Sequence, residues 1–187
     1  MKKERKMQKK LIGDKCKFAI EYSFCEGSHD TEIAMYVDGV NILAFDRNGE
    51  CLTTRWNIDE LAMWLRKFID EMAEDPFPVE CEGQFAAQKD DKAREFYTED
   101  IDLFDEYYQK LYEWELRHRW HSASSGAILA DVFFQSAGEY VEISWDNRDV
   151  ENGVSFKNKS GGAKIPKELF RTTVDSFLKQ YALFWFN

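Results

Sequence analysis

The sequence of 187 residues lacks the features that most readily assign a chain to a class. No apolar run approaches the ~20 residues that a membrane-spanning helix needs. The N-terminus is basic but lacks the apolar segment of a signal peptide, so we expect a cytoplasmic protein. There is no GxSxG elbow, no GxxxxGK[ST] phosphate loop and no HExxH motif. These absences favour a non-enzymatic protein, and we predict no cofactor and no metal site.

Cysteine is scarce and irregularly spaced. The four cysteines are Cys16, Cys25, Cys51 and Cys81, and no two of them form a CxxC pair. In a cytoplasmic protein this pattern favours free structural thiols. Two alternatives stay open, a secreted protein with two disulfides and a metal site assembled from scattered cysteines.

Positive charge is in short supply outside the first residues. The formal net charge is −10, yet residues 2–10 hold six bases and one acid. We predict that residues 1–12 form a basic, disordered lead and that residues 13–187 form a single domain of strongly negative charge. Such a body repels nucleic-acid phosphates and attracts basic proteins. We therefore expect a protein partner with a basic surface rather than a nucleic acid or a membrane.

The aromatic and apolar residues that are present indicate a substantial core. Hydrophobic residues make up 44% of the chain and aromatic residues 16%, and each buried ring removes roughly 150–250 Å² from water. Residues 127–135 and 139–145 read as a hairpin around Gly138. The second strand alternates, which predicts one face in a core and one nearer water. Its expected core side chains are Val141, Ile143 and Trp145, and its expected outer ones are Tyr140, Glu142 and Ser144.

Turn signals also divide the N-terminal third into short strands. Asp38-Gly39 and Asn48-Gly49 are pairs that favour the positive φ angles of a type I′ hairpin turn. Strands with such short connections pair antiparallel, as a meander. The expected strands cover residues 16–22, 31–37, 41–45 and 51–55, with another at 153–157 after the second hairpin; residues 159–162 read as a flexible turn.

Helical spacing predicts three main helices. The first begins after Asn57, a good N-cap, and ends before Pro76. The second and longest covers residues 98–120, with Thr98 as its N-cap. A further short helix after Gln84 stays open as an alternative to a loop. The last opens at Pro166. The second helix has a row of apolar residues at helical spacing that we expect to face the core, formed by Ile101, Phe104, Tyr107, Tyr108, Leu111 and Trp114.

Together these patterns predict an α+β fold. Antiparallel meanders from residues 15–55 and 127–157 form one curved sheet of about six to seven strands, and three main helices pack on it. In size, acidity and tryptophan content the chain resembles the small α+β immunity proteins that bacteria make against their own toxins. This resemblance implies that the chain neutralises a basic protein partner, and it assigns no site residue.

Two groups of polar residues are candidates for function. The longest predicted helix carries an acidic face suited to the basic partner, formed by Glu99, Asp102, Asp105, Glu106 and Glu113. The alternative is a small-ligand site or a hydrolase-like enzyme formed by Arg117, His118, Arg119, His121 and Asp131. Within it, Arg117 and Arg119 are suited to hold an anion. Ordinary ion pairing and helix-dipole complementation explain the same residues without a ligand.

Two residues add detail to these expectations. Asp131 falls inside an otherwise apolar strand, so it needs a partner, and Arg117 or Arg119 is the natural one. At the C-terminus, Phe184, Trp185 and Phe186 would be costly to expose to water. We expect these three rings to dock into the core or into a second copy of the chain as a homodimer.

Overall fold

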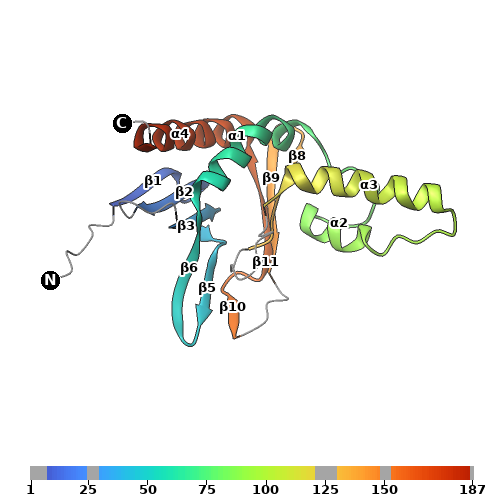
Figure 1. Ribbon diagram of the computed structural model, residues 1–187, viewed down its shortest axis with the longest axis horizontal. Coiled ribbons are helices and arrows are strands. Elements are labelled where there is room, and N and C mark those ends of the chain that lie inside the picture. The colour runs from blue at the N-terminus through green and yellow to red at the C-terminus, as the bar shows by residue number, and fades with distance from the viewer. Residues whose placement is uncertain (1–7, 25–29, 121–129, 148–152, 186–187) are drawn as a thin grey trace.

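The fold is α+β, with antiparallel sheets and four helices (Figure 1). The computed structural model describes residues 8–24, 30–120, 130–147 and 153–185. The larger sheet has seven strands: β1 (Gln8–Asp14), β2 (Phe18–Phe24), β3 (Asp30–Val37), β4 (Val40–Asn41), β5 (Ala44–Arg47), β6 (Glu50–Asn57) and β10 (Val154–Phe156).

A second sheet of four strands holds the C-terminal hairpin. Its spatial order is β11-β9-β8-β7, and all its pairings are antiparallel. The predicted α+β class and antiparallel meander are thus confirmed, but the strands of residues 127–157 are divided between two sheets. The second sheet comprises β7 (Arg119–Trp120), β8 (Val132–Ala137), β9 (Tyr140–Asp146) and β11 (Ser160–Pro166).

Four helices cover these sheets. In Figure 1, α1 and α4 run along one side of the molecule, while α2 and α3 lie beyond β8 and β9 at the far end. The last helix, rather than the third, is the longest, with 19 residues against 18. The helices are α1 (Ile58–Glu74), α2 (Ala86–Ala93), α3 (Ile101–His118) and α4 (Lys167–Trp185).

Local sequence signals account for most element boundaries. Asp38, Gly39, Asn48 and Gly49 all have positive φ, as the two type I′ turns require. Asn57 caps α1 by accepting a hydrogen bond from the Asp59 N–H at 2.9 Å. The cap of α3 is Asp100, not Thr98: its carboxylate accepts from the Leu103 N–H, and the helix begins later than predicted.

Three further boundaries differ from expectation. Residues 8–12, assigned to the disordered lead, form part of β1 and pair with β2, while residues 1–7 are outside the described part of the chain. β8 begins at Val132 and extends through Ala137, so the turn is Gly138-Glu139. Residues 160–162, expected to be a turn, are strand β11 paired with β9.

The main core lies between the two sheets and beneath α1 and α4. Phe18 packs on Phe170 with ring centroids 5.4 Å apart, and Tyr22 meets Phe177 edge-on at 5.5 Å. Side chains of β8, β9 and β10 join the same cluster. Phe134, for example, contacts both Phe170 of α4 and Trp64 of α1. One apolar core therefore unites the N-terminal and C-terminal thirds of the chain.

The middle of β8 and β9 is buried on both faces, which corrects the prediction for Glu142 and Ser144, whereas Tyr140 is exposed as predicted. Glu142 and Ser144 do not face water: each is almost fully buried beneath α2. Glu142 accepts the Ala86 N–H at 2.7 Å, and the Ser144 hydroxyl accepts the Ala87 N–H at 3.2 Å. Two side chains from the sheet thus cap the N-terminus of α2, which has no side-chain cap of its own.

A smaller core fixes α2 and α3 to this outer face. Trp114 is its centre, with Phe77 at 4.8 Å and Phe133 at 6.5 Å between ring centroids. Leu111 and three alanines of α2 complete the buried set. Because only the last two turns of α3 carry fully buried side chains, its N-terminal half projects beyond the second sheet. The side chains of residues 183–187, including the predicted docking rings, lie outside the described residues.

Candidate functional site

The surface of α3 carries two parallel stripes of different chemistry. One side of the helix is formed by residues at spacings of four, seven and four, namely Ile101, Asp105, Tyr112 and Leu116. We call this the apolar stripe, since three of its four members are large hydrophobic residues. Their exposed fractions are 74% for Ile101, 58% for Tyr112 and 47% for Leu116.

The neighbouring stripe is acidic. Asp102, Glu106 and Glu113 follow the same spacing pattern and are all exposed. We call these three residues the acidic stripe. Glu106 is paired with Lys110 at 2.6 Å and Glu113 accepts from Gln109 at 2.5 Å, while Asp102 has no ion-pair partner among the described residues. Glu99, just before the helix, is exposed as well.

The structure therefore brings the predicted partner-binding acids together on one accessible helix. Sequence reasoning missed their apolar neighbours because it assigned Ile101 and Phe104 to a buried stripe. Ile101 is in fact exposed, as is Phe104, whose ring is tilted against that of Tyr108 in the same helix with centroids 4.6 Å apart. The spacing of Ile101, Tyr112 and Leu116 was the available signal.

The predicted ligand-binding residues separate into two groups. Arg117 and His118 lie near Asp75, with the Arg117 guanidinium 4.0 Å and His118 Nε2 3.7 Å from its carboxylate. Arg119 instead pairs with Asp131. His121 lies outside the described residues. Two hollows lined by described residues lie elsewhere, one on the larger sheet and a small one between Phe85 and Trp145.

His118 is a core residue rather than an open ligand. Its ring stacks on Trp114, with centroids 4.5 Å apart, and its Nδ1 lies 2.7 Å from the Phe134 carbonyl oxygen. In the neutral ring Nδ1–H donates that hydrogen bond, which leaves Nε2 facing Asp75. Burial lowers the pKa of His118 to about 4, against the opposing effects of the carbonyl and of Asp75.

Arg119 of β7 is at the centre of an ion network with α2, α3 and Asp131, which lies just before β8 and not inside a strand as predicted. Its Nε and Nη2 donate to the two oxygens of Asp131 at 3.0 and 2.7 Å, the partner that the sequence required. Its Nη1 lies 3.7 Å from Asp90 and 3.5 Å from Glu115. Arg94 bonds to both of these carboxylates as well. Two guanidinium groups are thereby shared among three acids.

Glu115 is the acid of this network whose pKa is displaced. Burial and the neighbouring Asp90 raise the pKa of Glu115 to about 7, although Arg94 and Arg119 act in the opposite direction. The sequence signal for the network is the Asp90–Arg94 pair at i, i+4. Because both guanidinium groups have carboxylate partners, the network links α2, α3, β7 and the segment before β8.

Neither a metal cluster nor a membrane helix is found in the part of the chain that the structure describes. No group of three or more His, Cys, Asp or Glu side chains gathers there in a way that could hold a metal ion. No described helix is long and apolar enough to cross a membrane. Cys16, Cys51 and Cys81 are free thiols, and Cys25 lies outside the described residues.

No family model, no curated protein and no solved structure matches this chain.

Proposed function

We propose that this chain is a non-enzymatic binding protein that uses α3 to engage a protein partner with a basic surface. The observation that carries the proposal is the apolar stripe running beside the acidic stripe. Large hydrophobic residues that are exposed together, next to charged ones, mark protein interaction sites. Tyr112 is an especially suitable anchor, since tyrosine is frequent among the residues that contribute most to binding.

The charge of the chain supports a basic partner over a second copy. Two copies of α3 would bring acidic stripes together, and like charges across an interface cost free energy. A lysine- or arginine-rich surface would instead be attracted over long range, which speeds association. Neutralisation of a basic toxin, as in immunity proteins, is one activity of this kind. The small-ligand or hydrolase-like alternative has less support, because Arg119 and Asp131 are paired to each other and His118 is buried.

The test compares two triple variants that change the net charge equally. In the first, Asp102, Glu106 and Glu113 of the acidic stripe are replaced by lysine. The matched control replaces Glu50, Glu168 and Asp175, which are exposed on β6 and α4. Each protein is immobilised and used to capture partners at low and at high salt.

We expect the wild type and the control to retain the same basic protein at low salt and to release it at high salt. The α3 variant is expected to lose it, with binding weaker by about tenfold or more. Tyr112→Ala should weaken binding at both salt concentrations, because its contribution is apolar. Equal loss in the two triple variants would show that net charge, not the α3 surface, controls capture, and the proposal would then be wrong.

A further inference from the structure

The first turn of α3 exposes apolar side chains on more than one side of the helix. Three of its four residues are large hydrophobic residues that remain exposed, namely Ile101, Leu103 and Phe104. One turn takes 3.6 residues, so successive residues point about 100° apart around the axis. Leu103 therefore lies almost opposite Ile101, with Phe104 between them and Asp102 on the remaining side.

The chain just before the helix extends this apolar end. Tyr97 is 77% exposed. Ten large hydrophobic residues are exposed in the described part of the chain, and six of them lie between residues 97 and 116. In Figure 1 the N-terminal end of α3 projects beyond the second sheet, away from the main core. Exposed apolar side chains that gather at one projecting end mark an interaction site.

The conformation of this end is set by contacts of the chain with itself. Phe96 stacks on Tyr107, with ring centroids 4.0 Å apart. The Tyr108 hydroxyl donates towards the carbonyl oxygens of Arg94 and Phe96, at 3.0 and 3.1 Å. The helix itself is capped by Asp100. Because the shape exists before binding, less conformational entropy is lost when a partner encloses it.

A helix turn that is apolar on several sides requires a concave partner. A flat surface contacts one side of a helix, so it would leave either Ile101 or Leu103 in water. A cleft contacts several sides at once and removes both side chains from water, which is favourable in proportion to the apolar area buried. The acidic stripe runs along the side of Asp102, so the wall that faces it is expected to carry lysine or arginine.

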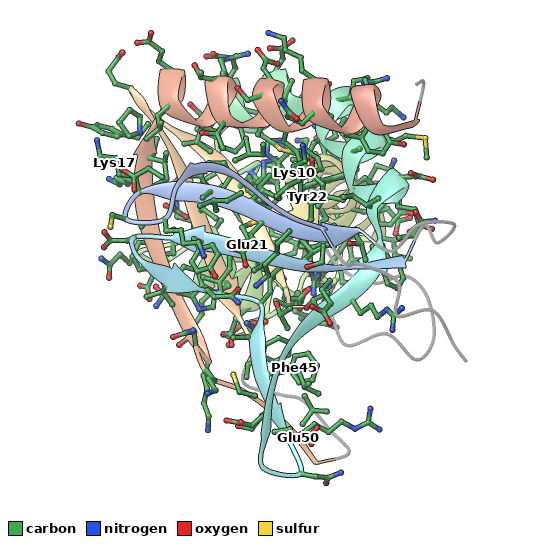
Figure 2. All side chains as sticks on the ribbon, turned by 90° about the vertical axis from the view of Figure 1, so that its left-hand side faces the viewer. Lys10, Lys17, Glu21, Tyr22, Phe45 and Glu50 are labelled. Carbon is green, nitrogen blue, oxygen red and sulfur yellow. The ribbon has the colours of Figure 1, made fainter. Side chains whose placement is uncertain are left out.

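Neither a second copy of the chain nor a lipid surface matches this end as well as a basic cleft does. Figure 2 shows the opposite end of the molecule, where Glu21 lies on the larger sheet. Glu21 is bound by Lys9 at 2.8 Å and by Lys15 at 2.6 Å, so both lysines are already paired. The hollow on this sheet is lined by acids as well as bases, namely Glu21, Glu32, Arg47 and Arg55. Anionic lipids are repelled by the three acids among residues 99–102.

We propose that the basic partner of α3 is a protein with a cleft that receives the first turn of the helix. Lysine or arginine side chains on one wall face the acidic stripe, and apolar side chains on the other walls contact Ile101, Leu103 and Phe104. This inference rests on the proposed function and adds a shape to the charge of the partner. A flat basic partner would satisfy the proposed function and contradict the cleft.

The experiment is hydroxyl-radical footprinting of the full chain, alone and in complex, read by mass spectrometry. The complex is formed with the basic protein that the wild type retains at low salt and the α3 charge variant does not. Oxidation of each side chain reports its exposure to water. Met63 of α1 and Tyr140 of β9, which are both exposed, are the internal controls. The affinity of Leu103→Ala is compared with that of its matched control, Met63→Ala.

We expect the complex to protect Ile101, Leu103 and Phe104 together, while Met63 and Tyr140 react as they do in the free chain. Leu103→Ala should weaken affinity about tenfold, because an enclosed leucine side chain contributes at least that much when it leaves water. Met63→Ala should leave the affinity unchanged.

Three outcomes would contradict the inference, and they can be told apart. Protection of Ile101 without Leu103 would show a flat partner, which overturns the cleft and leaves the proposed function standing. Binding of the free chain to vesicles of phosphatidylcholine and phosphatidylglycerol through the first turn of α3 would assign this turn to a lipid surface and overturn the cleft as well. Failure to retain any protein in a way that depends on the acidic stripe would overturn the proposed function, and the cleft with it.

Discussion

At the scale of single residues, two titratable groups of α3 make the stability of the fold depend on pH. His118 and Glu115 lie one turn apart on α3, and their pKa values are displaced in opposite directions, to about 4 and about 7. For His118 the cause is loss of hydration. For Glu115 it is burial together with the carboxylate of Asp90. Folding stability therefore depends on pH through two contributions of opposite sign.

The contribution of His118 is expected to favour the folded state above pH 6.5. The folded protein binds its proton less readily than the unfolded chain, so stability is lost as pH falls from about 6.5 towards 4. The full effect is on the order of 3 kcal/mol. We predict that urea denaturation of wild type and His118→Gln will show a stability difference that shrinks over this interval.

Glu115 must be controlled for in that experiment. Its raised pKa gives stability that is present below about pH 4.5 and lost as pH rises through 7, the reverse of the histidine. The comparison is therefore repeated in a Glu115→Gln background, where the histidine effect stands alone. A His118 ring that titrates between pH 6 and 7 by NMR would contradict the prediction.

Glu142 illustrates how much one buried acceptor can determine. It accepts the Ala86 N–H at the start of α2 and the Gln135 side-chain amide, both at 2.7 Å. We predict that Glu142→Ala lowers the free energy of unfolding by about 2–4 kcal/mol, because two buried donors lose their partner. Glu139→Ala, at the exposed turn of the same hairpin, is the control and should change stability by less than about 0.5 kcal/mol in a urea titration.

At the scale of elements, β11 shows why two consecutive glycines can belong in a strand. A Cβ at Gly161 would stand 2.6 Å from Cζ2 of Trp145, and one at Gly162 would stand 2.6 Å from Cδ1 of Phe85. Both rings therefore lie flat against the strand where side chains would otherwise project. The glycines provide space for aromatic packing rather than flexibility.

We predict that Gly161→Ala destabilises the fold by about 1–3 kcal/mol, since the buried indole of Trp145 must move to admit a methyl group. Thermal denaturation followed by circular dichroism measures the effect. Ser160→Ala, the preceding and exposed residue of β11, is the matched control. An unchanged melting temperature for Gly161→Ala would mean that the indole has room to shift.

Element prediction from sequence succeeded where local chemistry decides the structure. The Asp38-Gly39 and Asn48-Gly49 turns, the Asn57 cap and the end of α1 before Pro76 were all predicted correctly. It failed where distant contacts decide. The sequence around residues 160–162 does not predict their contacts with Trp145 and Phe85. The sequence around Glu142 does not predict its contact with α2. For the candidate site, the sequence placed the acids on one helix, and their role in binding stays a prediction. The exposure of Ile101 depends on where α3 leaves the second sheet, which the sequence does not show.

At the scale of the whole molecule, two apolar cores of unequal size share the second sheet. The larger includes both sheets, α1 and α4, and the smaller holds α2 and α3 to the outer face around Trp114. Regions held by fewer buried contacts open at lower free energy than the main core. The proposed binding surface therefore lies on the part of the molecule that opens most easily.

We predict that hydrogen exchange will divide the chain accordingly. Backbone amides of the first two turns of α3 should exchange at least about a hundredfold faster than those of β2 and β3. Trp114→Ala should accelerate exchange throughout α2 and α3 while β2 and β3 change little. Uniform acceleration in all four elements would instead indicate a single cooperative unit.

The placement of β10 has a consequence for how the protein is made. Val154–Phe156 pairs with β5, although it lies between β9 and β11 of the other sheet in sequence. During synthesis, the edge of β5 stays unpaired until β10 has been made. Until then, this edge is available for pairing with strands of other chains. Once β10 is paired with β5, the chain connects the two sheets at this point. Separating the sheets then requires breaking the hydrogen bonds between β10 and β5.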